Sequence, residues 1–113
     1  MDEILSKAKS LLKNLDVLID VYDFSIMWAS EKTAKTLGYS VDELKKMYLF
    51  DIMAYRKDRA RSMTAEDFKR IEGVRELKLK SKDKKPVPIK TLFKFFKFGD
   101  GYYLIGEILE YKK

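Results

Sequence analysis

The first fifteen residues carry apolar side chains at helical spacing. They follow the i, i+3, i+4, i+7 rule, and the remaining positions are mostly polar. The apolar stripe consists of Met1, Ile4, Leu5, Ala8, Leu11, Leu12 and Leu15. The pattern predicts an amphipathic helix over residues 1–14, because Asn14 tolerates the left-handed conformation that ends many helices.

The next segment changes from helical spacing to alternation. Apolar and mixed positions alternate over residues 17–22, which is typical of a strand. Residues 23–25 are short and polar enough for a tight turn, and residues 26–29 form a second apolar run. Two strands this close in sequence are expected to pair as an antiparallel hairpin.

Two helix signals follow the hairpin. Ser30 is a suitable N-cap for a helix over residues 31–37, and Gly38 stands where a glycine commonly ends a helix. Ser40 and Glu43 have the spacing of a capping box, so a second short helix is expected after Ser40.

The centre of the chain has a weaker pattern. Residues 56–63 are highly charged and predict a loop or an irregular helix. Thr64 can cap a further helix in which Phe68 and Ile71 face inward, and Gly73 would end that helix.

The last forty residues predict three long strands, over residues 75–80, 86–98 and 102–111. Gly99 and Gly101 mark the last turn, since glycine adopts positive φ without strain. Strands that pair as neighbours, with short helices grouped between them, indicate an α+β fold.

Composition restricts the chemistry. The 113 residues contain neither Cys nor His, which excludes a thiolate nucleophile, an imidazole base and the usual zinc ligands. A hydrophobic content of 46% suits one globular domain. No apolar run is long enough for a membrane helix and no signal peptide is evident, so we expect no membrane association and a cytoplasmic location.

The net charge of +6 arises from residues 69–113, which leaves two interpretations open. Phosphate attraction together with stacking on Phe96 would suit a nucleic acid. A lysine-protected sheet surface is the simpler explanation and is preferred, because no nucleic-acid motif accompanies the charge. The lysines concerned are Lys78, Lys80, Lys82, Lys84, Lys85, Lys90, Lys94 and Lys97.

Four stretches in order resemble the PAS family of sensor domains. They are Val21-Tyr22-Asp23 with Ile26-Met27-Trp28-Ala29-Ser30, Leu37-Gly38-Tyr39-Ser40 with Asp42-Glu43-Leu44, Gly73 through Lys82-Asp83-Lys84-Lys85, and Phe98-Gly99-Asp100-Gly101-Tyr102 to Glu110. The resemblance spans about residues 14–111, so residues 15–113 are expected to form the PAS domain. The sequence departs from the family at Ser30, where Asn is frequent, and at Lys84, where Gly is usual.

The resemblance implies a five-stranded antiparallel sheet that curves around a small cavity beneath short helices, with an N-terminal amphipathic helix. PAS domains bind haem, flavin, small acids or no ligand, and they pass signals to output domains or partner proteins such as those of two-component systems. A covalent flavin adduct needs Cys and the usual haem needs His, so neither group is expected here. A non-covalent small ligand, or a packed core without one, remains.

Apolar residues expected on the cavity side are candidates for ligand contact, although ordinary core packing is the preferred explanation for each of them. They are Ile19, Met47, Phe50, Met53, Phe68, Leu77, Phe93, Tyr103 and Ile105. Arg56, Arg59 and Arg61 could meet a ligand carboxylate or simply face solvent.

The N-terminal stripe has two interpretations. Ile4, Leu5, Ala8, Leu11 and Leu12 could form a homodimer interface, as the resemblance implies, or cover the domain's own sheet. Both can hold together.

An enzymatic role is not expected, because no nucleophile with an adjacent base, no phosphate loop and no metal cluster is present. Asp20 and Asp23 lie three positions apart, which places them on opposite faces of a strand. The sequence therefore predicts a sensory or regulatory input domain. The alternatives are a ligand-free dimerisation module and a nucleic-acid-binding protein.

Overall fold

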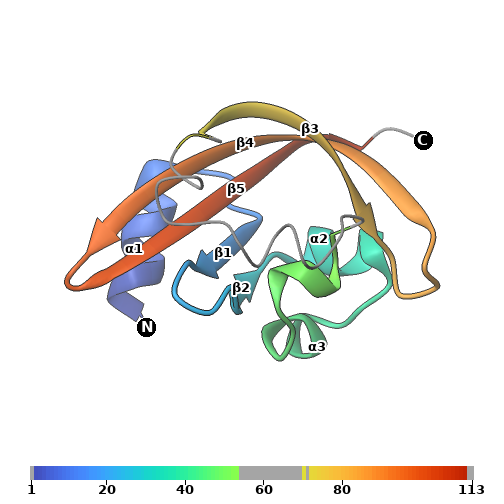
Figure 1. The fold of residues 1–113 in the computed structure, drawn as a ribbon, viewed down its shortest axis with the longest axis horizontal. Helices are drawn as coiled ribbons and strands as arrows, with labels where there is room; N and C mark the ends of the chain where they lie inside the picture. Colours follow the sequence, from blue (N-terminus) through green and yellow to red (C-terminus); the bar gives the residue numbers. More distant parts are fainter. Residues whose placement is uncertain (1, 54–69, 71, 112–113) are drawn as a thin grey trace.

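One antiparallel sheet organises the chain, and its strands are not arranged in sequence order (Figure 1). The computed structural model describes residues 2–53, 70 and 72–111. In chain order the elements are α1 (Asp2–Leu11), β1 (Val17–Asp20), β2 (Ile26–Ala29), α2 (Glu31–Leu37), α3 (Val41–Lys45), the 3₁₀ helix η1 (Leu49–Asp51), β3 (Gly73–Lys80), β4 (Pro86–Phe98) and β5 (Gly101–Tyr111). The sheet has five strands in the order β2-β1-β5-β4-β3, which confirms the predicted α+β fold.

The helix signals act where they were expected. Ser30 accepts a hydrogen bond from the Thr33 amide at the start of α2, and Gly38 ends this helix at a φ of 84°. Ser40 and Glu43 form the reciprocal capping box at the start of α3. Each cap satisfies backbone amides that a helix start leaves without partners, which allows helices of only five to seven residues to form.

Three boundaries differ from the predictions. The first helix ends at Leu11, earlier than Asn14, although Leu12 still donates a backbone hydrogen bond to Ala8. Strand β1 ends at Asp20, and Tyr22 is 93% exposed in the following turn. Gly73 is the first residue of β3, with a φ of 105°, while the helix predicted before it lies outside the described residues.

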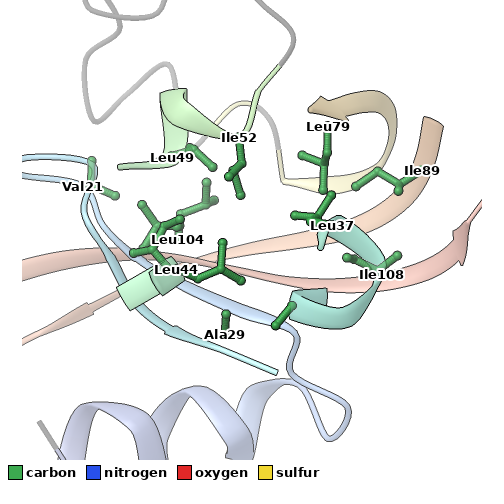
Figure 2. Close-up of a cluster of buried hydrophobic side chains, with 13 residues drawn as sticks. Val21, Ala29, Leu37, Leu44, Leu49, Ile52, Leu79, Ile89, Leu104 and Ile108 are labelled. Carbon is green, nitrogen blue, oxygen red and sulfur yellow. The ribbon is translucent and has the colours of Figure 1, made fainter. Parts of the chain in front are cut away.

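The two faces of the sheet bury different clusters of side chains. On the first, here called the inner face, Ile19, Leu104 and Ile108 pack with residues of α2, α3 and η1. On the second, the outer face, Leu18 and Ile105 pack beneath α1. Figure 2 shows the inner cluster above the strands and α1 below them. The sheet is therefore a central layer with helical cover on both sides.

Candidate functional site

The inner face is the candidate site because short, separately capped elements cover it. Leu37 of α2, Leu44 of α3, and Leu49 and Ile52 in and after η1 all point into the cluster over the strands (Figure 2). These elements have few residues each, so their positions depend on contacts with the sheet more than on their own helical stability.

Partly buried apolar side chains border the buried cluster. Met47, Phe50, Met53, Leu77 and Phe93 all pack against it and retain some exposure, while Ile19 is fully buried within it. The structure thus brings together six of the nine side chains predicted for the pocket. Their contact with a ligand stays a prediction. Phe68 lies outside the described residues, as do Arg56, Arg59 and Arg61.

The predicted cavity side was wrong for Tyr103 and Ile105. Both belong to the outer cluster beneath α1. The register between β4 and β5 pairs Phe95 with Leu104, and side chains of paired residues share a face. Leu104 therefore faces inward, and its neighbours Tyr103 and Ile105 face outward. The strand is apolar on both faces, so its sequence alone did not reveal which residues point inward.

A segment between the sheet edges crosses the inner face. We call residues Met47–Met53 the bridging segment. At one end the Ile26 amide donates to the Met47 carbonyl at 3.0 Å, and Tyr48 forms a β-bridge with Ser25 beside β2. At the other end Met53 forms a β-bridge with Leu79 of β3. The segment therefore connects the two outermost strands.

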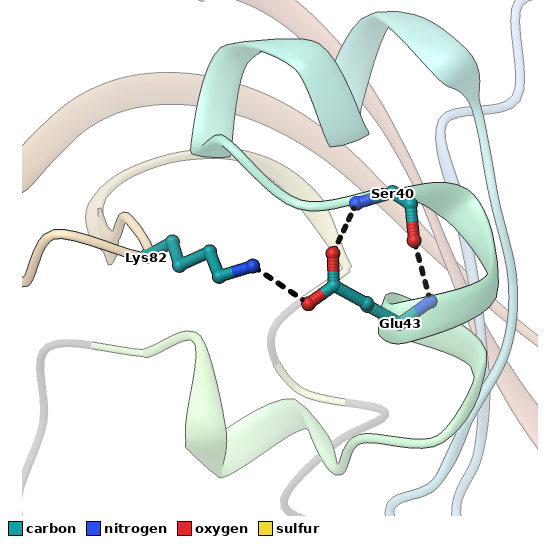
Figure 3. Close-up of polar contacts among 3 residues, drawn as sticks. All are labelled: Ser40, Glu43 and Lys82. Atoms are coloured by element: carbon teal, nitrogen blue, oxygen red, sulfur yellow. Dashed lines mark hydrogen bonds and ion pairs between the residues drawn. The ribbon is translucent and has the colours of Figure 1, made fainter.

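An ion pair fixes the cover at the β3–β4 turn (Figure 3). The Lys82 ammonium donates to the Glu43 carboxylate at 2.8 Å, and the second carboxylate oxygen of Glu43 accepts from the Ser40 amide. The Lys82 amide also donates to the Leu37 carbonyl at 2.8 Å. The hydrogen bond from Lys82 is the main cause that lowers the pKa of Glu43, and the same contact raises the pKa of Lys82.

A buried carboxylate joins the start of β1 to α2 and β5, and sequence reasoning missed it. One oxygen of Asp16 accepts from the Ser30 hydroxyl at 2.7 Å, and the other accepts from the Ile108 amide at 2.7 Å. The Asp16 side chain is almost fully buried. Its position between Leu15 and Val17 in an apolar stretch is the one signal that could have drawn attention to it, since buried carboxylates need partners.

The outer face resolves part of the question about the N-terminal stripe. Ala8 and Leu12 are buried against the sheet, and Ile4, Leu5 and Leu11 pack partly buried against the same cluster. The helix therefore covers the sheet of its own domain, which was one of the two interpretations of the stripe. Trp28 also lies at this cluster, with the Lys9 ammonium 5.2 Å from its ring centre.

The lysine-rich surface lacks its expected aromatic partner. Phe96 is 8% exposed beneath α1, which leaves it unsuited to stacking on a base. The Lys94 ammonium donates to the Leu11 carbonyl at 3.3 Å, and Lys82 pairs with Glu43. These contacts favour the structural interpretation of the charge.

The acidic residues near the first hairpin serve local turns. Asp20 accepts from the Tyr22 amide and Asp23 from the Ser25 amide, each at 2.9 Å.

Within residues 2–53, 70 and 72–111, no three potential metal ligands come together. Among the same residues no helix has the length and apolar character needed to span a bilayer.

Comparison with known proteins identifies the fold. No family model and no curated protein matches the sequence. A PAS domain from a two-component sensor histidine kinase is 16% identical with a TM-score of 0.71, over 99% of this chain and 100% of that one. The PAS domain of a Desulfitobacterium hafniense protein is 22% identical with a TM-score of 0.71, over 86% and 92% of the two chains. A light-oxygen-voltage domain studied with a flavin analogue is 17% identical with a TM-score of 0.60, over 94% and 84%. The chain has the PAS fold across nearly its whole length.

Proposed function

We propose that this chain is a sensory or regulatory input domain of a cytoplasmic signal-transduction protein, such as a sensor histidine kinase. In this proposal it binds a small organic ligand non-covalently on its inner face and has no catalytic role. The observation that carries the proposal is the PAS fold together with adaptable side chains, such as Met47 and Met53, at the border of the inner cluster.

The donor set limits the cofactors that fit. A light-oxygen-voltage domain is among the similar structures, yet this chain has no Cys to form a thiol adduct with a flavin. It also has no His to bind haem iron in the usual way. A ligand held by apolar contacts and hydrogen bonds suits the residues present.

The mechanism we propose is a shift between two arrangements of the inner cover. A ligand that prefers one position of α2 and α3 would change the population of that position. Ser30, at the start of α2, bonds Asp16, and Asp16 bonds the β5 amide of Ile108. A movement of α2 would therefore reach both the N-terminal connection and the last strand, from which an output domain or signalling partner could receive it.

Native mass spectrometry of the purified protein tests ligand binding. A reproducible additional mass that dissociates on collisional activation is the expected result. Protein without any additional mass, from several growth conditions, would contradict ligand sensing and leave the dimerisation module as the better explanation.

We propose in addition that the chain forms a homodimer through the parts of α1 that its own sheet leaves exposed. Leu11 packs only partly on the sheet, so a second copy could complete its burial. Sedimentation equilibrium should give a dimer mass that Leu11→Gln lowers towards the monomer. Lys7→Gln, on the exposed side of the same helix, should leave the dimer intact. A monomeric wild-type protein at high concentration would refute this part.

A further inference from the structure

Two hydroxyl groups on the inner face have no hydrogen-bond partner among the described residues. They are the Thr91 Oγ1 atom and the Tyr111 phenol oxygen, and both are buried. Thr91 is 2% exposed and lies on β4 between the inward-facing Ile89 and Phe93. Buried polar groups in proteins almost always have a partner, so two such groups on one apolar face need an explanation.

Both side chains belong to the same face. The methyl group of Thr91 lies 3.2 Å from where a Cβ on Gly106 would stand, beside Val17 and Phe93 of the inner face. The Tyr111 ring packs against the inner cluster, with the Lys32 ammonium of α2 5.4 Å from its centre.

An irregularity in β5 brings Tyr111 to this face. Thr91 pairs with Ile108 and Lys90 pairs with Glu110, so Leu109 is an extra residue in β5. In a regular strand Tyr111 would point away from the face that holds Ile108, since side chains alternate. The bulge reverses the alternation, and bulges often redirect a side chain beside a functional site.

The hydroxyls have no structural benefit in this arrangement. Val has nearly the shape of Thr, and Phe has nearly the shape of Tyr, without the cost of an unpaired buried hydroxyl. A polar group of a bound molecule would remove that cost in both places. The side chains Ile89, Ile108 and Phe93 around Thr91 are apolar, which favours an uncharged partner there, and the Lys32 ammonium over the Tyr111 ring is exposed to solvent.

We propose that Thr91 and Tyr111 form the polar end of the ligand site on the inner face. The ligand class is a compact, mainly apolar, uncharged molecule whose hydroxyl or carbonyl group bonds one or both of these side chains. The inference rests on the proposed sensory function and names the chemistry of the same site.

A matched pair of probes tests it, 4-ethylphenol and ethylbenzene, titrated into ¹⁵N-labelled protein and followed by amide chemical shifts. Wild-type protein should bind the phenol about tenfold more tightly, as expected for one net hydrogen bond. Thr91→Val combined with Tyr111→Phe should bring the two affinities close together. Thermal melting of the ligand-free variants at or above the wild-type temperature would show that they remain folded.

Two variants outside the site serve as controls. Thr36→Val removes an exposed hydroxyl that donates to the Lys32 carbonyl, and Tyr22→Phe removes the hydroxyl of an almost fully exposed ring. Both should keep the tenfold preference. A preference that persists in Thr91→Val combined with Tyr111→Phe would overturn the inference, and so would equal binding of the two probes or no binding of either at millimolar concentration. A co-purifying ligand in the native mass spectrum would still support the proposed function in each of these cases.

Discussion

The inner and outer faces of the same sheet are built in different ways. Among the described residues the outer face is covered by one helix of ten residues; Ala8 of this helix and Leu18 and Ile105 beneath it are completely buried. In the same described part of the chain, the inner face is covered by three separate elements of seven, five and three residues. One long helix presents a continuous apolar stripe, whereas the short elements each need their own cap or ion pair to stay in place.

This difference separates stability from adaptability. Residues of the outer cluster lie in a closely packed layer where a missing methyl group leaves a cavity. Residues at the border of the inner cluster, such as Met53 and Phe50, are partly exposed and can move without leaving a cavity. We therefore expect the border of the inner cluster to be the part that adapts, while the buried residues of both clusters hold the sheet.

The largest effect should come from truncating side chains on the two faces. Ile105→Ala should reduce the free energy of unfolding by about 2–5 kcal/mol, because the Ile105 side chain is completely buried. Met53→Ala, at the inner border, should cost clearly less, about 1 kcal/mol. Urea denaturation of both variants measures the difference. Equal losses would show that the border of the inner cluster is packed as closely as the outer cluster.

An intermediate effect should follow from removing the buried carboxylate. Asp16→Ala leaves the buried Ile108 amide without its acceptor and removes the Ser30 contact, which should cost about 2–3 kcal/mol. Ser30→Ala, which keeps the Ile108 contact, should cost about 1 kcal/mol through loss of the cap. Hydrogen exchange should also show faster opening at Ile108 in Asp16→Ala. An unchanged exchange rate there would contradict a role for Asp16 in joining α2 to β5.

The smallest effect should come from the ion pair that holds the inner cover. The pKa of Glu43 is lowered from its ordinary 4.5, so its contribution is present above that pH and is lost as the pH falls through the lowered value. The pKa of Lys82 is raised from 10.5, so its contribution is present below that pH and is lost as the pH rises through the raised value. Glu43→Gln should therefore lower the melting temperature slightly at pH 7, and this difference should shrink as the pH falls below 4.5.

Salt provides the control for this prediction. Both groups of the pair are largely exposed, and ions screen exposed pairs. The difference between wild type and Glu43→Gln at pH 7 should shrink in 1 M NaCl. A difference of equal size at pH 3 would show that the loss does not come from the ionised pair, since the Gln side chain can still accept from the Ser40 amide.

Local signals in the sequence were sufficient to predict which described segments form helices and which form strands. The caps at Ser30 and Ser40 and the glycine at position 38 depend on residues at most four apart, so the chain itself displays them. Lys84 shows the limit of such signals. It takes a φ of 66° in the β3–β4 turn, where PAS domains usually have Gly, so the turn keeps its conformation without the residue that favours it.

Long-range features could not be predicted. The outward direction of Tyr103 and Ile105 is determined by pairing with β4, and a strand apolar on both faces does not reveal it. The Asp16 contact joins residues 92 positions apart, and the redirection of Tyr111 depends on one extra residue in β5. Each of these requires knowledge of the register, which a single sequence does not contain.

The bridging segment also limits the size of a ligand that could lie beneath it. Tyr48 contacts the β2 side of the sheet and Met53 contacts β3, and five peptide steps between them can extend to roughly 18 Å at most. The edges of the sheet can therefore separate only so far while both contacts hold. A ligand too large for that width would have to break one of the two β-bridges of the bridging segment. Small and large ligands would therefore leave the domain in two different structures, one with both bridges and one with a single bridge.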